Sequence, residues 1–583
     1  MGSYSFSKLV LLSAISWLVI FLAIFFVVGC NSTGKDAVMT GEKLADTVLV
    51  KGNFYTVDEK NSRAEAVAIE DGTIVYVGSM KGIDPYIGKK TEVIDLKGKF
   101  AMPSFVDSHM HPLSNAYAIN FQAALFNLST HEEYIKAIRE FAEKHPNMDG
   151  IMGGGFEPIV YAATGGAKKE ALDAIDSTRP IGIVSKDIHA MWVNSKALAM
   201  AGITKDTPNP EGGVIERDPT TGEPTGMLME MPAMSLVWNL LPAATKEDYK
   251  TSLLWMQDYL NRKGITTAHD AWAEYDPNYY KAFGELAKEG KLTVRYRGSW
   301  LIDPNAEDTV TDQIDHGFEL SERFNHPHFK VHSFKFMADG IVEDATALLI
   351  DPYANDSSSR GIKKWKDRAM VNAFAKVDRA GYQIHTHAIG DGAVKYTVAA
   401  LEQVQTLNGK RDSRHSLAHV QLARPEDVTK MGELGLSAHM SQYWMIMDDG
   451  YDTFYLPNLG DERANNTYPH QSLIDAGVNV PIASDFITSE PDLMTAIYNG
   501  MTRSSAGGEQ LLPASECVTL KQMLKAATIN GAYANFLENE IGSLEVGKKA
   551  DIVVLSKNLF EIKTKNIPDV EIKMTFFEGK RVH

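Results

Sequence analysis

Between about residue 100 and residue 535, short apolar segments rich in β-branched residues alternate with helical patterns. This alternation is typical of βαβ units and predicts a parallel sheet covered by helices. Eight segments qualify as parallel strands, and they are residues 102–109, 265–270, 292–299, 331–337, 382–387, 416–420, 436–441 and 478–485. Because eight parallel strands close into a barrel, we expect an α/β fold of the (β/α)8 TIM-like class.

The segments outside this repeat predict further parts of the fold. Residues 112–262 are far too many for one crossover connection, so they predict an inserted subdomain. Residues 45–100 and 536–583 contain short runs of β-branched residues broken by glycines, a pattern that predicts short strands and tight turns. We therefore expect a small β-sandwich formed from both chain ends, bracketing a barrel with its insertion at residues 101–535.

The N-terminus has the composition of an export segment. Lys8 precedes an uncharged apolar run at residues 9–28, which predicts a signal peptide at residues 1–29 and a tether at residues 30–44. The Val-Val-Gly-Cys sequence that ends at Cys30 resembles the lipobox of bacterial lipoproteins, which implies lipidation of Cys30. We expect an exported lipoprotein, attached to a membrane of a bacterial cell envelope and facing the periplasm. An uncleaved anchor is the alternative, because about 18–20 apolar residues can span a bilayer.

The composition excludes several classes of partner and site. The chain carries 58 Lys and Arg against 75 Asp and Glu, a formal charge of −17, and no basic stretch, so nucleic acid is not expected to bind. With only two cysteines, the 583 residues cannot form a disulfide framework or a thiolate metal cluster. A metal site in this chain would have to use His, carboxylate or a modified residue.

Polar residues recur at the carboxyl ends of the expected strands. His109 and His111 lie two apart at the end of the first strand and point to the same side. His387, His419 and Asp485 end three later strands. Since the carboxyl ends of barrel strands converge on one site, this pattern predicts a divalent metal site, with zinc as the expected ion.

Lys335 is a charged residue inside an otherwise apolar expected strand. A free ammonium is costly in a barrel interior. We expect Lys335 to be neutralised by burial and carboxylated by CO2, so that its carbamate bridges two metals. The alternatives are a lysine that reaches solvent or one that pairs with Asp339.

Taken together, these motifs resemble a known family. They are residues 103–111, 387–391, 419–421, 484–485 and 542–555, with further matches at 179–180, 189–198, 222–226 and 264–270. The chain is similar to the amidohydrolase superfamily, specifically its amidohydrolase family 3 branch. The resemblance implies a metal-dependent barrel hydrolase with a small sandwich built from the two chain ends.

The resemblance also implies a ligand set and a reaction. His109 and His111 would bind one metal with Asp485, His387 and His419 would bind a second, and carboxylated Lys335 would bridge them, although some superfamily members use a single ion. A metal-activated hydroxide would attack the substrate carbonyl, with Asp485 as general acid and base. We expect hydrolysis of a non-peptide C–N bond in a small amide, N-acyl, N-formyl or cyclic amide substrate.

Other residues are candidates for supporting roles. His189 in the insertion is a candidate substrate ligand by the same resemblance, Tyr443 could line an apolar pocket, and Arg503 could meet a substrate carboxylate or form a surface ion pair. His385 faces the same way as His387 but one layer deeper, which favours a supporting or core position. A homo-oligomer is left open. The alternative function is a catalytically inactive binding or regulatory lipoprotein on the same scaffold.

Overall fold

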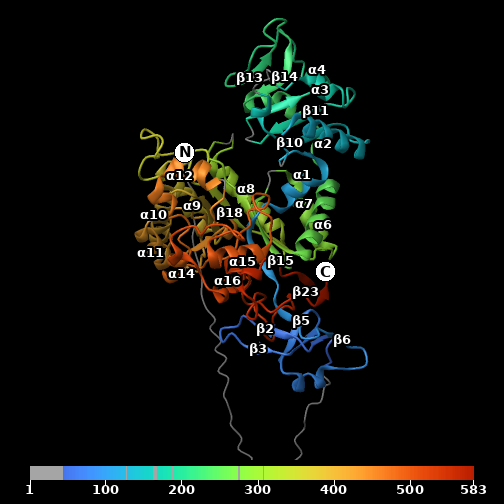
Figure 1. Cartoon of the computed structure of the whole chain (residues 1–583), viewed down its shortest axis with the longest axis vertical. Helices are drawn as coiled ribbons and strands as arrows, with labels where there is room; N and C mark the ends of the chain where they lie inside the picture. The colour runs from blue at the N-terminus through green and yellow to red at the C-terminus, as the bar shows by residue number, and fades with distance from the viewer. Residues whose placement is uncertain are drawn as a thin grey trace, which may run out of the picture. The chain divides into compact units, whose positions relative to one another are not determined.

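The computed structural model describes residues 44–126, 128–161, 167–186, 189–273, 276–305, 308–448 and 450–583 (Figure 1). The expected signal peptide at residues 1–29, Cys30 and the tether up to residue 43 lie outside these described residues. Among the residues that are described, no helix has both the length and the apolar character needed to cross a bilayer.

The centre of the fold is a parallel sheet that confirms the expected TIM-like barrel. Its seven regular strands run in the order β21-β20-β19-β18-β16-β15-β8, and each pairs in parallel with its neighbour. Their bounds are β8 Phe105–Met110, β15 Ile265–Ala273, β16 Arg295–Leu301, β18 Phe329–Met337, β19 Gln383–Ala388, β20 Ser416–His419 and β21 Ser437–His439. A short strand, β17 (Asn325–His326), pairs with β18 outside this order.

The eighth expected strand, residues 478–485, closes the barrel without forming a regular strand. Asn479 and Ile482 make isolated parallel bridges to Ser437 and Met440. On the other side, Ser108 N donates to Ile482 O at 3.0 Å, and Asp485 N donates to His109 O at 2.8 Å. The segment therefore joins the β21 edge of the sheet to β8.

Helices cover the barrel. Among them are α1 Pro112–Phe121, α6 Lys246–Arg262, α7 Pro277–Lys288, α8 Val310–Arg323, α9 Asp367–Arg379, α10 Asp391–Asn408, α11 Pro425–Glu433, α14 His470–Asp475, α15 Leu493–Thr502, α16 Leu520–Ala526 and α17 Ile529–Ala534. Local sequence sets several helix starts: Thr245 and Asp248 form a capping box at α6, as Thr519 and Gln522 do at α16. Leu113 of α1 and Leu253 of α6 belong to the main barrel core.

The inserted subdomain has its own sheet and its own apolar core. It is shorter than the expected insertion at residues 112–262, because α1 and α6, at the two ends of that range, pack on the barrel core. Its strand order is β13-β14-β12-β11-β10-β9. The strands are β9 Ala123–Ala124, β10 Ile151–Phe156, β11 Ile181–Ser185, β12 Ala190–Val193, β13 Val214–Arg217 and β14 Pro224–Met229, and the helices are α2 His131–Lys144, α3 Lys169–Asp173, α4 Ser195–Met200 and α5 Met231–Trp238. Trp192 and Leu228 are fully buried in the two apolar clusters of this subdomain.

Two further sheets come from the chain ends. One has the order β5-β4-β1-β6, and the other, β24-β23-β22-β7-β2-β3, combines N-terminal and C-terminal strands. Their bounds are β1 Thr47–Val50, β2 Asn53–Tyr55, β3 Arg63–Ala64, β4 Ala66–Glu70, β5 Thr73–Gly78, β6 Glu92–Asp95, β7 Phe100–Pro103, β22 Ile552–Leu555, β23 Ile572–Phe577 and β24 Lys580–Arg581. The last N-terminal strand of these sheets, β7, pairs with β22 and ends at Pro103, six residues before His109 of the barrel motif.

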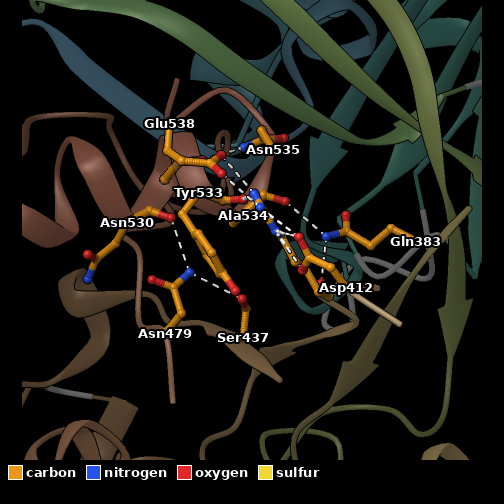
Figure 2. A network of polar contacts seen from close by, with 11 residues as sticks. Gln383, Asp412, Ser437, Asn479, Asn530, Tyr533, Ala534, Asn535 and Glu538 are labelled. Carbon is orange, nitrogen blue, oxygen red and sulfur yellow. Dashed lines mark hydrogen bonds and ion pairs between the residues drawn. The ribbon is translucent and has the colours of Figure 1, made fainter. Parts of the chain in front are cut away.

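Polar networks link the lower, amino-terminal ends of the barrel strands to the C-terminal segment. Arg295 donates to Glu578 at 2.8 Å and to Asp551. Arg414, which precedes β20, donates to both oxygens of Glu538 at 2.8 Å. Figure 2 shows part of the second network, in which Gln383 at the start of β19 donates to the Ala534 carbonyl at 2.9 Å. These contacts lie at the opposite end of the strands from the histidine motifs.

Candidate metal centre

Six candidate ligands come from the carboxyl ends of the barrel strands. β8 supplies His109 and leads into His111, β18 supplies Lys335, β19 supplies His387, and β20 ends at His419. Asp485 follows the closing segment. Each position is set by strand register, because residues two apart on a strand share a face.

His109, His111 and Asp485 form a compact group. Asp485 Oδ1 lies 3.0 Å from His111 Nε2 and 3.4 Å from His109 Nε2. One ligand atom from each residue lies within 4.8 Å of the other two, a spacing that can hold one ion. Only 1% of the His109 side chain is exposed, compared with 23% for His111, so the group opens towards solvent on the His111 side.

Lys335, His387 and His419 lie next to this group. Lys335 Nζ is 3.5 Å from His109 Nε2. The ring centroid of His419 is 5.0 Å from that of His109 and 4.7 Å from that of His387. The six candidate ligands therefore lie in one connected cluster.

Burial sets the protonation of this cluster. Desolvation holds the pKa of His109 and His387 well below the usual histidine value, and it lowers the pKa of His419 to about 4. Burial also lowers the pKa of Lys335 to about 7, although the charge of Asp485 opposes the shift. For Asp485, burial would raise the pKa, but hydrogen bonds with His109 and His111 outweigh it and hold the pKa well below the usual range.

The cluster fits a divalent metal. Neutral imidazole nitrogens and an ionised carboxylate are the protonation states that ligate zinc-type ions. His419 Nδ1 is buried and accepts or donates no hydrogen bond among the residues that the structure describes. A buried polar nitrogen without a partner is costly, and a bound ion would remove that cost.

Asp339 contributes a contact that the sequence motifs did not assign. Its carboxylate accepts hydrogen bonds from the backbone amides of Leu348, Ile389 and Gly390. Asp339 Oδ1 also lies 3.6 Å from His387 Nε2, which is 3.0 Å from Gly340 O. With Nε2 held in this way, His387 Nδ1 is the nitrogen available to a metal. The sequence had suggested Asp339 only as a possible partner of Lys335, not as a neighbour of His387.

Two tryptophans flank the cluster. Trp444 stacks on His419 with ring centroids 5.2 Å apart and donates from Nε1 to Ser489 Oγ at 2.9 Å. Trp272, near the end of β15, meets the His111 ring edge-on at 6.3 Å. No sequence motif identified Trp272, because only the folded barrel brings it next to His111.

The candidate substrate residues have different surroundings. Tyr443 is buried next to Trp444, and burial raises the pKa of its hydroxyl well above 10. His189 is in the inserted subdomain, is 68% exposed, and lies 3.1 Å from Glu230. Arg503 is the expectation that the structure contradicts.

Arg503 is fully buried rather than on a surface or facing a substrate. Its guanidinium donates to four backbone carbonyls, which belong to Thr467, Tyr468, Leu511 and Leu512. A guanidinium whose donors are used by carbonyls in this way holds loops together. These carbonyls, rather than a substrate carboxylate or a surface acid, accept its hydrogen bonds in the structure.

The fold and this cluster define the class of protein, and comparison with known proteins agrees with them. The model of the amidohydrolase family (Amidohydro_3) matches residues 92–583, so the chain belongs to this family. This confirms the family resemblance found in the motifs.

Individual relatives extend the likeness over most of the chain. A Bacillus subtilis (strain 168) protein named as the amidohydrolase YtcJ is 29% identical over 91% of this chain and 98% of its own length. The N-substituted formamide deformylase of Arthrobacter pascens is 25% identical, covering 92% of this chain and 98% of its own. A solved structure, an uncharacterised metal-dependent hydrolase from Pyrococcus furiosus, is 21% identical with a TM-score of 0.70, over 88% of this chain and 99% of its own.

Proposed function

We propose that this protein is a metal-dependent hydrolase of non-peptide C–N bonds in small amide-type molecules. The observation that carries the proposal is the convergence of His109, His111 and Asp485 within 4.8 Å at the carboxyl end of a barrel. Lys335, His387 and His419 lie beside them and would complete the set of ligands. The relative named as a formamide deformylase makes N-substituted formamides the first substrates to test.

A divalent ion in this cluster, most simply zinc, would supply an activated water and polarise the substrate carbonyl. His109 and His111 would hold it through Nε2, and His387 through Nδ1. A CO2-derived carbamate on Lys335 would turn this buried amine into an anionic ligand that can bridge two ions.

Asp485 is placed to move a proton. Its low pKa keeps it ionised near neutral pH, so it can accept a proton from the attacking water. Oδ1 faces the two histidines, and Oδ2 accepts a 3.5 Å hydrogen bond from Thr488. Asp485 would then return the proton to the leaving nitrogen as the C–N bond breaks.

The test is a metal-reconstituted preparation lacking residues 1–29, offered N-substituted formamides, N-acyl amino acids and cyclic amides. We expect tightly bound metal and hydrolysis of at least one class. In Asp485→Asn, turnover should fall by roughly 10²- to 10⁴-fold, the usual contribution of a general acid–base group. Absence of bound metal from the wild-type protein would contradict the proposal and favour a binding or regulatory protein.

We also propose that the N-terminus attaches the protein to a bacterial envelope membrane through lipid on Cys30. The support is the apolar run at residues 9–28 and the Val-Val-Gly-Cys sequence. Mass spectrometry of membrane-extracted protein should find a diacylglyceryl group on an N-terminal Cys30. A mature chain that begins at Met1 would show an uncleaved anchor instead.

A further inference from the structure

His109 has close polar neighbours at both ring nitrogens. Nε2 lies 3.4 Å from Asp485 Oδ1 and 3.5 Å from Lys335 Nζ, whereas Nδ1 lies 2.6 Å from Nε2 of His385. An imidazole ligates a metal through the nitrogen without hydrogen, and the other nitrogen then carries the hydrogen. Because Nε2 faces the ligand cluster, Nδ1 is the atom that donates to His385.

This donation determines the protonation of the next ring as well. His385 accepts at Nε2, so its own hydrogen is on Nδ1, which lies 2.7 Å from Ser416 Oγ. The Ser416 hydroxyl in turn donates to the Ile384 carbonyl at 3.5 Å. The reverse direction would put a hydrogen on His109 Nε2 and remove its lone pair from the cluster. The chain of hydrogen bonds thus selects one tautomer for both rings.

Strand register places His385 one layer below His387. It pairs directly with Lys335 on β18 and with Ser416 on β20, whereas His387 lies one layer nearer the rim. His385 and Ser416 are both fully buried. The ring centroids of His109 and His385 are 4.8 Å apart and the ring planes are inclined by 38°, so the two rings are not stacked face to face. They meet through the hydrogen bond between His109 Nδ1 and His385 Nε2. His385 therefore supports a ligand from below and is not one of the rim residues.

We propose that His385, held by Ser416, is a positioning residue that fixes the tautomer and ring plane of the metal ligand His109. The inference rests on the proposed function, since it requires a metal in the cluster. Metal-bound histidines usually donate to a carboxylate, a backbone carbonyl or water, and loss of that partner typically weakens metal binding by roughly 10- to 100-fold. Here the neutral imidazole of His385 accepts that hydrogen bond, and it does so without adding a charge to the barrel interior.

The test compares three variants of the full-length protein with the wild type. His385→Leu removes the acceptor, whereas His385→Gln offers an amide oxygen where Nε2 lies. His332→Leu is the matched control, because His332 is also a buried histidine of the barrel, and its ring contacts those of His269 and Phe536 rather than a candidate ligand. Zinc affinity is measured on apoprotein by competition with a chelator, and thermal unfolding of each apoprotein is measured separately.

We expect zinc affinity to fall roughly 10- to 100-fold in His385→Leu, to be largely retained in His385→Gln, and to be unchanged in His332→Leu. The absorption spectrum of the cobalt-substituted protein should shift in His385→Leu, because the geometry around His109 changes. Wild-type zinc affinity in His385→Leu, or an equal loss in His332→Leu, would overturn the inference. Wild-type protein that binds no zinc would instead overturn the proposed function.

Discussion

At the scale of single residues, the environment of each polar side chain decides its chemistry. His109 and Arg503 are both buried, but His109 faces other ligands and Arg503 faces backbone carbonyls. The sequence identified His109 as a candidate metal ligand because a second histidine, His111, follows two positions later. The surroundings of Arg503 depend on loops that a motif does not describe, so the sequence did not show that backbone carbonyls hold its guanidinium.

Lys335 carries the first prediction at this scale. In crystals grown with zinc and bicarbonate, electron density should continue beyond Nζ as a carbamate, because burial lowers the pKa of this amine to about 7 and so leaves much of it neutral and nucleophilic. Lys335→Ala should lose metal, and adding a short-chain carboxylic acid should restore part of it by replacing the missing ligand. Density that ends at a bare ammonium in the metal-loaded crystal would contradict this prediction.

At the scale of elements, the period of the sequence predicted most strands and helices. In the sequence, apolar residues recur with a helical period at residues 249–262 and 369–380, and these two stretches fall almost wholly within α6 and α9. Residues 478–485 were expected as a strand, and they close the barrel through isolated bridges instead. Such closure depends on both neighbours, β21 and β8, so the segment alone could not show it.

The connection between β20 and the C-terminal segment gives a prediction at this scale. Arg414→Ala should lower the free energy of unfolding by about 2 kcal/mol, because it removes two charge-assisted hydrogen bonds to the partly exposed Glu538. Arg414 also stacks 4.0 Å from the centroid of the Tyr533 ring, so the loss includes packing. Urea unfolding followed by circular dichroism measures the change.

The matched control for Arg414 is an exposed ion pair. Lys51 and Asp95 are 2.8 Å apart, but their side chains are 63% and 38% exposed. Lys51→Ala should change stability by less than about 1 kcal/mol, as is usual for surface pairs. Equal effects of the two substitutions would show that the Arg414 network does not stabilise the fold.

At the scale of the whole molecule, the chain ends and the barrel are stabilised by charged groups that link them. Glu578 lies 2.8 Å from Arg295 and 3.0 Å from His328. Burial would raise the pKa of Glu578, but the hydrogen bond with His328 and the charge of Arg295 outweigh it and bring the pKa to about 2. In the unfolded chain a glutamate titrates near about 4.3.

This difference predicts the pH dependence of stability. Because the folded pKa is the lower one, the ionised Glu578 stabilises the fold fully above about pH 4, and that contribution is lost as the pH falls through about 2. The wild type should therefore be more stable than Glu578→Gln at pH 7, and the difference should shrink between pH 4 and pH 2. Denaturant unfolding at several pH values measures it, with the exposed Glu322→Gln as control. A difference that does not change with pH would contradict the prediction.

The sequence by itself determined the barrel class, the family and the set of candidate ligands, because strand periods and short motifs are local properties of the chain. The tertiary structure decided how the barrel closes, which carboxylate holds His387, and what Arg503 binds. It also decided that His109 meets His385, a residue 276 positions away. The physical reason is that each of these contacts joins distant segments, and only the packed barrel brings their side chains within hydrogen-bonding distance.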